Sequence, residues 1–283
     1  MKFKNEAAQL YVPGKCGSKE ALGRTTALCI AAHQDDIEIM AYGPIVSCYD
    51  KPDEWFTAVV VTDGAGSPRS GIYESYTDEM MKNVRISEQN TAAKIGKYSS
   101  CLQLAFPSSA VKDNKTNDVT DEIKKVILEC NPDIIYTHNI ADKHETHVAV
   151  ALRVIRAIRE LPKENRPQKL ISLEVWRGLD WLCDSQKVVL DTSKHPNLAA
   201  ALLGVYDSQI AGGKRYDLAA FGRRTANATF FASHSVDSSD SVSYGLDLSE
   251  LMDENLQIND FIFEYIDAFK SEVSKNIDKY LKL

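Results

Sequence analysis

The stretch ALCIAAHQDDIEIMAYG, residues 27–43, joins an apolar run to a dense group of polar side chains. Its first six residues are apolar, as in a strand buried inside a parallel sheet. His33, Asp35, Asp36 and Glu38 then follow within six residues. In an open parallel sheet, ligands bind in the crevice beyond the carboxyl ends of the strands. The stretch therefore predicts both a strand of such a sheet and a functional site at its end.

Apolar runs alternate with helical segments along the first half of the chain. Strands are predicted at 26–32, 56–62, 101–106 and 133–137. Apolar residues spaced three or four apart predict helices at 79–96, at 119–130 and after residue 146. Strands separated by helices indicate βαβ units, and therefore an α/β fold with a parallel sheet.

The second half of the chain is less regular. Further strands are predicted at 170–176 and 187–190. Helices are predicted at about 196–210 and 258–281, and polar loops at 163–168 and 233–241. No internal repeat or long low-complexity linker divides the 283 residues. We therefore expect a single domain over 1–283, with a core at about 25–160 and a C-terminal elaboration at about 161–283.

Charge and cysteine usage argue against several classes of protein. The net charge is −7 with both signs interspersed, which argues against nucleic acid as a partner. We expect no membrane span, because no apolar stretch is long enough, and a cytoplasmic location, because the first residues do not resemble a secretory signal. The six cysteines contain no CxxC pair, so neither a disulfide framework nor a cysteine-based zinc site is indicated. The oligomeric state stays open, a homo-oligomer included.

A second polar cluster, THNIADKHETHVAV, occupies residues 137–150 and contains three of the six histidines. Two histidines and one carboxylate that leave a position open to water are typical of catalytic zinc. The available set is His33, Asp36 and His147. Such nitrogen and oxygen ligands also accept Fe²⁺ or another divalent ion.

The remaining polar residues of the two clusters suit proton transfer. Adjacent aspartates in a tight turn cannot both face one metal, so Asp35 is the candidate base and Asp36 the ligand. His144 is the candidate acid, or the group that stabilises an oxyanion. Taken singly, each cluster has a simpler explanation, because Asp is a common helix N-cap and paired histidines usually lie on the surface. Together, at strand ends, they favour a metal site.

Candidate substrate-binding residues surround these clusters. They are Asp63, Arg69, Arg85 and His138. Asp63 and His138 each follow a predicted strand, and Arg69 lies in the polar loop after Asp63. Arg85 either lines the pocket or pairs with Glu88 on its own helix. Aromatic residues that could stack on a sugar ring are Tyr73, Tyr76 and Trp176.

At these residues the chain resembles the PIG-L/LmbE-like de-N-acetylases, which include GlcNAc-phosphatidylinositol de-N-acetylase and deacetylases of bacillithiol and mycothiol synthesis. The family's AHPDD-Glu signature stands here as AHQDDIE, residues 32–38, and its second histidine signature as HETH, residues 144–147. VVVTDGAG (59–66) and RISEQNTAAKIG (85–96) are similar to further family segments. Weaker similarity extends to YDSQ (206–209) and ANATFF (226–231).

The resemblance implies a fold, a metal and a reaction. The implied fold is a Rossmann-like three-layer α/β sandwich with a mostly parallel sheet. Zinc would be bound by His33, Asp36 and His147, with Asp35 as general base and His144 as acid or oxyanion-stabilising group. The implied reaction is hydrolysis of the acetamide on an N-acetylglucosaminyl-type substrate, a small N-acetylated sugar or glycoconjugate.

The chain departs from the family pattern at two places. Gln34 replaces a proline, which removes a fixed φ from the ligand turn. Glu145 and Thr146 replace Pro-Asp before the second histidine ligand, and the lost carboxylate is of a kind that orients metal ligands. Either Asp142 or Glu145 is expected to substitute for it.

Two other functions compete with deacetylation. One is a zinc amidase that cleaves a larger conjugate amide, and the other is a non-catalytic protein that binds metal and sugar. Retention of Asp35 disfavours the second, because a binding protein needs no base. A dinucleotide site is disfavoured too, since HQDD stands where a glycine-rich phosphate turn would be.

Overall fold

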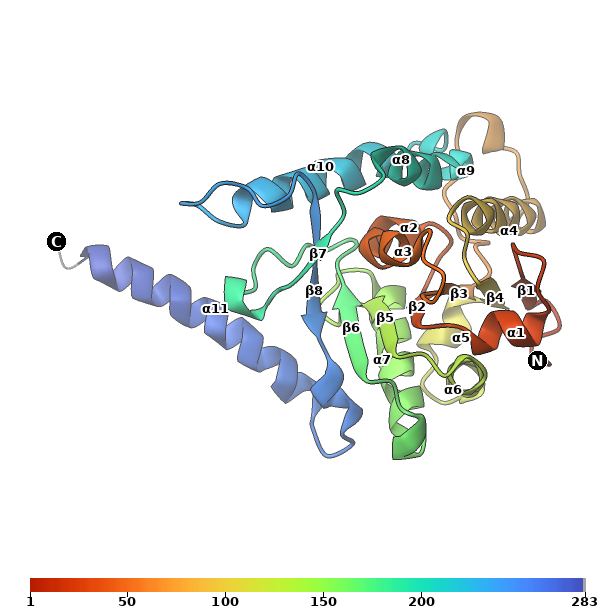
Figure 1. The fold of residues 1–283 in the computed structure, drawn as a ribbon, viewed down its shortest axis with the longest axis horizontal. Helices are drawn as coiled ribbons and strands as arrows, with labels where there is room; N and C mark the ends of the chain where they lie inside the picture. Colours follow the sequence, from red (N-terminus) through yellow and green to blue (C-terminus); the bar gives the residue numbers. More distant parts are fainter. Residues whose placement is uncertain (282–283) are drawn as a thin grey trace.

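An eight-stranded sheet runs through the middle of the molecule (Figure 1). The computed structural model describes residues 1–281. The strands are β1 (Gln9–Tyr11), β2 (Ala27–Ala31), β3 (Phe56–Thr62), β4 (Ser100–Phe106), β5 (Ile134–His138), β6 (Lys169–Leu173), β7 (Val188–Asp191) and β8 (Val242–Asp247). Their order across the sheet is β1-β4-β3-β2-β5-β6-β8-β7. Strands β4, β3, β2, β5 and β6 run parallel, whereas β1, β7 and β8 pair antiparallel. The predicted, mostly parallel α/β sheet is confirmed.

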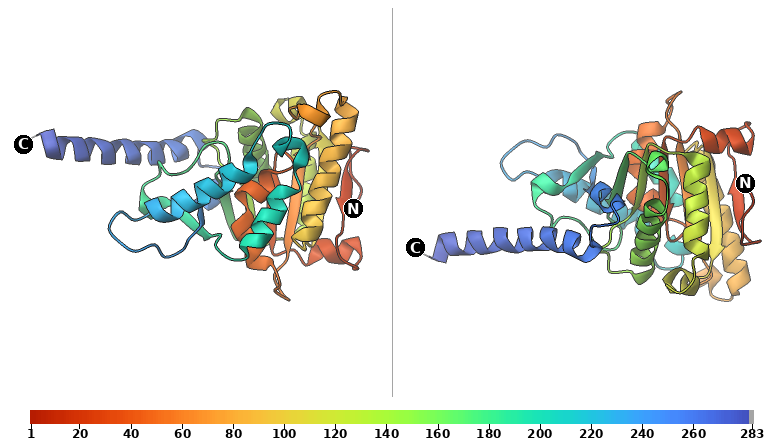
Figure 2. Two further views of the ribbon diagram at one scale, coloured as in Figure 1. Left: turned by 90° about the horizontal axis from the view of Figure 1, so that it is seen from above. Right: turned by 90° about the horizontal axis from the view of Figure 1, so that it is seen from below.

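Helices cover both faces of this sheet (Figures 1 and 2). One layer contains α1 (Ser18–Gly23), α5 (Ser108–Lys112), α6 (Asp118–Cys130) and α7 (Glu145–Arg159). The other contains α2 (Asp36–Met40), α3 (Tyr42–Cys48), α4 (Asp78–Ile95), α8 (Pro196–Gly204), α9 (Asp207–Ile210) and α10 (Tyr216–Phe230). The last helix, α11 (Ile258–Leu281), extends away from the sheet. Short 3₁₀ turns are η1 (Gly71–Tyr73), η2 (Lys163–Asn165), η3 (Asp184–Gln186) and η4 (Ser249–Met252).

Strand β2 shows why three layers form. All five of its residues are buried, and successive side chains of a strand point to opposite faces. Leu28 and Ile30 therefore join the core beneath α6 and α7, while Cys29 and Ala31 join the core beneath α2 and α3. A strand apolar on both faces must be covered on both faces.

Several predicted elements differ from the observed ones. The predicted helix at 196–210 is two helices, α8 and α9, because the backbone leaves the helical conformation at Tyr206, whose hydroxyl reaches the buried Glu38. The predicted strand at 170–176 ends at Leu173, since Glu174 turns its side chain inward to accept the Tyr244 amide. Strands β1 and β8 and helices α1, α2, α3, α5 and α10 were not predicted.

The loop prediction at 233–241 agrees with the structure, which has no helix or strand between Phe230 and Val242. Among the described residues, no helix combines the length and apolar character needed to cross a membrane.

Candidate metal centre

The ends of three neighbouring parallel strands bring the two polar clusters together. Residue His33 follows β2, Asp63 follows β3, and His138 is the last residue of β5. His144 immediately precedes α7, so the start of that helix points into the same edge of the sheet. The turn after β2 is tight: Asp35 has φ +91°, a backbone conformation that residues other than glycine rarely adopt.

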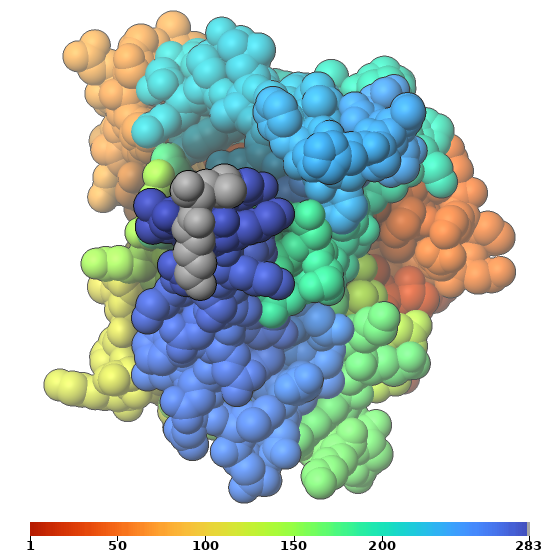
Figure 3. Space-filling view, turned by 90° about the vertical axis from the view of Figure 1, so that its left-hand side faces the viewer, coloured from red at the N-terminus to blue at the C-terminus, as the bar shows by residue number. Residues whose placement is uncertain are grey.

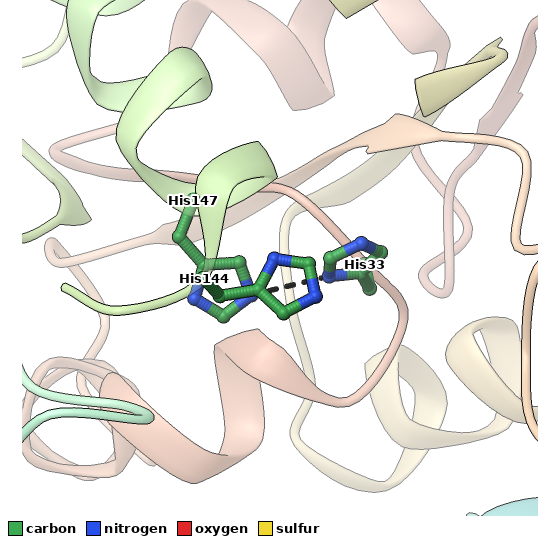
Figure 4. Close-up of side chains that lie close together, drawn as sticks. All are labelled: His33, His144 and His147. Atoms are coloured by element: carbon green, nitrogen blue, oxygen red, sulfur yellow. Dashed lines mark hydrogen bonds between the residues drawn. The ribbon is translucent and has the colours of Figure 1, made fainter. Parts of the chain in front are cut away.

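Three potential ligand atoms form a small triangle at this edge. His33 Nδ1 lies 3.0 Å from Asp36 Oδ2 and 3.2 Å from His147 Nε2, and Asp36 Oδ2 lies 3.3 Å from His147 Nε2. Figure 4 shows His144 and His147, from the start of α7, turned toward His33. The rings of His144 and His147 are stacked, with centroids 4.5 Å apart.

This triangle has the size that a zinc ion requires. Ligands about 2.0–2.1 Å from one ion in a tetrahedral arrangement lie about 3.3–3.4 Å from one another. Burial opposes ionisation of Asp36, but the facing His147 and His33 outweigh it and hold the pKa of that carboxyl well below its usual range. An ionised carboxylate and two imidazoles thus converge on one point.

Asp142 takes the place of the missing carboxylate at residue 146. Its Oδ2 lies 3.5 Å from His147 Nδ1, and its two oxygens accept the backbone amides of His144 and Trp176. Glu145, in contrast, is exposed and lies 3.7 Å from Lys112. Of the two candidates, Asp142 is therefore the residue that orients His147.

Gln34, the replacement for proline, is buried and tied to the sheet. Its side-chain amide donates to the Thr62 carbonyl at 3.3 Å and to Gln103 at 3.2 Å. The neighbouring Gly64 has φ +73°, and a Cβ there would lie 2.7 Å from Gln34 Oε1. A glycine is required at 64 because Gln34 and Arg85 pack directly against it.

Asp35 is held by a buried ionic network. Arg85 donates to Asp35 Oδ2 and to Glu88, each at 2.8 Å, and to the Gln34 carbonyl. Glu88 in turn accepts the amide and hydroxyl of Ser208, at the start of α9. Burial raises the pKa of Asp35 to about 6, against the opposing charge of Arg85. A carboxylate with that pKa is suited to accept a proton near neutral pH.

A pocket of about 670 Å³ opens over the triangle. We call its base the inner chamber, formed by His33, Asp35, Asp36, Arg85, His144 and His147. We call its outer part the mouth, formed by Lys143, Trp176 and Lys214. The two ammonium groups lie 5.8 and 5.2 Å from the centroid of the Trp176 ring.

Of the four predicted substrate-binding residues, only Arg85 lines this pocket. His138 is fully buried: its Nε2 accepts the Ala32 amide at 2.8 Å and its ring stacks on His147, so it supports the inner chamber from beneath. Asp63 caps its own turn and lies 3.4 Å from Lys82. Arg69 pairs with the exposed Asp78 outside the pocket. None of these three side chains lines the pocket, so direct substrate contact by them stays a prediction that their positions do not support.

A buried carboxyl group, Glu38, lies behind the inner chamber and is not among the predicted site residues. Glu38 is fully buried and accepts hydrogen bonds from Tyr98, Tyr206 and Gln89. Burial raises the pKa of Glu38 to about 7. The sequence signal that could have pointed to Glu38 is the YDSQ segment, residues 206–209. Its Tyr206 hydroxyl donates to Glu38 and its Ser208 hydroxyl donates to Glu88.

Comparison with known proteins finds a family model that matches the part of the chain around this site. Residues 28–158 match the family model described as PIG-L, GlcNAc-PI de-N-acetylase. The matched segment contains every residue of the inner chamber, while β6, β7, β8 and two of the three mouth residues, Trp176 and Lys214, lie beyond it. No curated protein sequence matches the chain.

Solved structures share the fold of this protein at low sequence identity. N,N'-diacetylchitobiose deacetylase from Pyrococcus horikoshii is 14% identical, with a TM-score of 0.65 over 84% of this chain and 88% of its own. The A40926 pseudoaglycone deacetylase Dbv21 is 15% identical, with a TM-score of 0.58 over 79% and 97%. GalB, a 4-carboxy-2-hydroxymuconate hydratase from Pseudomonas putida KT2440, is 16% identical, with a TM-score of 0.63 over 79% and 96%. The fold therefore hosts hydration as well as deacetylation, and it is the family match that supports a deacetylase hydrolase.

Proposed function

We propose that this protein is a zinc-dependent N-deacetylase that acts on an N-acetylglucosaminyl-type substrate. The observation that carries the proposal is the triangle of His33, Asp36 and His147, with a separately held carboxylate beside it. Zinc held there would polarise the acetamide carbonyl and make water acidic enough to attack it near neutral pH.

Asp35 is proposed to move the proton. Asp35 lines the pocket; its Oδ2 accepts a hydrogen bond from Arg85, whereas its Oδ1 accepts none from residues 1–281. Oδ1 would take the proton of the attacking water and deliver it to the amide nitrogen as the carbon–nitrogen bond breaks. The products are acetate and a free amine.

His144 is proposed to face the reacting carbonyl. It lines the pocket, and its Nδ1 has no hydrogen-bond partner among the described residues. Burial and the neighbouring His147 lower the pKa of His144. A neutral imidazole can still donate one hydrogen bond, which is what a developing oxyanion needs.

The mouth is suited to a sugar that carries a negative charge. Trp176 offers an aromatic face on which a sugar ring can stack. Lys143 and Lys214 flank it and have no acidic partner among the described residues. In a chain with a net charge of −7, two free ammonium groups at a pocket entrance favour a phosphate or carboxylate on the substrate.

A screen of N-acylated sugars tests this proposal. The purified protein is incubated with N-acetylglucosaminides with and without a phosphate or carboxylate, and with analogues that carry larger acyl groups. We expect acetate release, fastest for the anionic compounds, and none from a His147→Ala variant. Release of only the larger acyl groups would establish the competing amidase, and no release of any acid would overturn hydrolysis.

A further inference from the structure

The C-terminal helix α11 leaves the body of the molecule after its first turns (Figures 1 and 2). Phe261 and Ile262 are buried in the core, whereas every residue from 269 to 281 is exposed. Figure 3 views this free end head-on. An isolated helix shorter than about 12–15 residues is marginal in water, so the free part of α11 needs support that the rest of the chain does not provide.

One face of the free part is apolar. We call this face the C-terminal stripe, which consists of Ile266, Phe269, Val273, Ile277 and Tyr280. Their side chains are between 40% and 62% exposed. Residues spaced three and four apart lie on one side of a helix, so these five form a continuous surface. A contiguous exposed apolar surface of this kind marks an interaction site.

The spacing of the C-terminal stripe points to a second copy of the same chain. Successive members are three, four, four and three residues apart, so the pattern reads identically in both directions from Val273. In an antiparallel pair centred on Val273, Ile266 lies level with Tyr280 of the other copy, and Phe269 with Ile277. Each apolar side chain then meets an apolar side chain, as a two-fold symmetric interface requires.

The charges of α11 favour the same arrangement. Residues 266–281 carry three acidic and three basic side chains: Asp267, Lys270, Glu272, Lys275, Asp278 and Lys279. In the antiparallel pair, Asp267 lies level with Lys279 and no two like charges share a level. A parallel pair would place every charge level with its identical copy. The balanced charge also disfavours an anionic membrane surface, which selects a basic polar face.

We infer that α11 joins two copies of this protein by antiparallel packing of the C-terminal stripe about a two-fold axis at Val273. None of the residues that line the pocket belongs to α11, so this interface leaves both pockets open to substrate.

Sedimentation velocity of the full chain over a range of concentrations tests the pairing. The variant Val273→Glu places a charge at the centre of the stripe, and Ser271→Glu adds the same charge to the opposite side of the helix. Wild type and Ser271→Glu are expected to dimerise equally. The dissociation constant of Val273→Glu should rise at least about tenfold, which corresponds to about 1.4 kcal/mol. At protein concentrations low enough for wild type to be monomeric, the two melting temperatures should be equal, because residue 273 is exposed in the monomer. A monomeric wild type, or equal association of both variants, would overturn the inference.

Distances between spin labels test the orientation. Single cysteines are placed at Ser274 and at Asn259, in a background in which the half-buried Cys16 and Cys183 are serine. Antiparallel helices centred on Val273 place the 274 labels close together and the 259 sites about 42 Å apart along the axis, at about 1.5 Å per residue. Short distances at both sites would mean parallel helices and contradict the two-fold arrangement.

Discussion

The inner chamber and the mouth of the pocket differ in how their side chains are held. In the inner chamber, Asp35, Arg85 and His147 are buried, and each contacts a charged partner from another segment. At the mouth, Lys143 and Lys214 are exposed and make no ion pair within residues 1–281. Buried charges are costly to leave unpaired, whereas exposed charges contribute little to stability. The inner chamber is therefore built for fixed geometry, and the mouth for contact with a ligand.

The largest expected effect separates the two adjacent aspartates of the inner chamber. Asp35→Asn should lower kcat by about 10²–10⁴-fold, the contribution typical of a positioned base, while metal stays bound. Asp36→Asn should lose the metal as well, because its Oδ2 belongs to the ligand triangle. Acetate release and metal content, measured on the same samples, distinguish the variants. Full turnover by metal-loaded Asp35→Asn would show that the base is misassigned.

The next effect concerns stability. Arg85→Met should lower the free energy of unfolding by about 3–5 kcal/mol, because it leaves the buried carboxylates of Asp35 and Glu88 without a positively charged partner. Arg69→Met is the matched control: it breaks an ion pair with the exposed Asp78 and should cost less than about 1 kcal/mol. Urea denaturation measures both. Equal losses would mean that the Arg85 network is no better buried than the surface pair.

A smaller effect is expected from the residue that orients His147. Asp142→Asn should weaken zinc binding by about 10–100-fold, the usual effect of removing a group that orients a ligand. Glu145→Gln should leave zinc affinity unchanged, because Glu145 points to solvent near Lys112. Competition with a chelating dye measures both constants. The reverse order would assign the supporting role to Glu145.

The smallest effect belongs to the mouth. Trp176→Ala should raise KM about tenfold with little change in kcat, because the ring would bind ground and transition states alike. Phe230→Ala removes an exposed aromatic ring outside the pocket and should change neither constant. If Trp176→Ala lowers kcat instead, the mouth takes part in the chemistry and its contrast with the inner chamber disappears.

The sequence predicts six of the eight strands, and it selects the three residues that the structure brings together as the triangle, because these signals are local. An apolar run followed by HQDD fixes where β2 ends, and the spacing of His144 and His147 fits the start of one helix. For the carboxylate that orients His147, the sequence leaves two candidates, Asp142 and Glu145. For Arg85 it leaves two roles, lining the pocket or pairing with Glu88. Choosing between them requires knowing which side chain points inward, and that is decided by packing.

Contacts between distant segments were beyond prediction. Glu38 meets Tyr206 across 168 positions, and Glu88 meets Ser208 across 120. The spacing of apolar residues around Glu38 or Glu88 does not indicate which distant residue each carboxyl group contacts. The substrate contacts predicted for Asp63, Arg69 and His138 stay untested, and each of these side chains contacts a partner that the sequence does not reveal.

Titration of metal-free protein with zinc tests the central claim most directly, namely that the inner chamber is a hydrolytic centre with one metal. Zinc is added stepwise while acetate release is recorded. We predict that activity is absent at the start, rises linearly and stops increasing at one zinc per chain. Full acetate release by the metal-free protein, or zinc binding that restores no activity, would contradict the account.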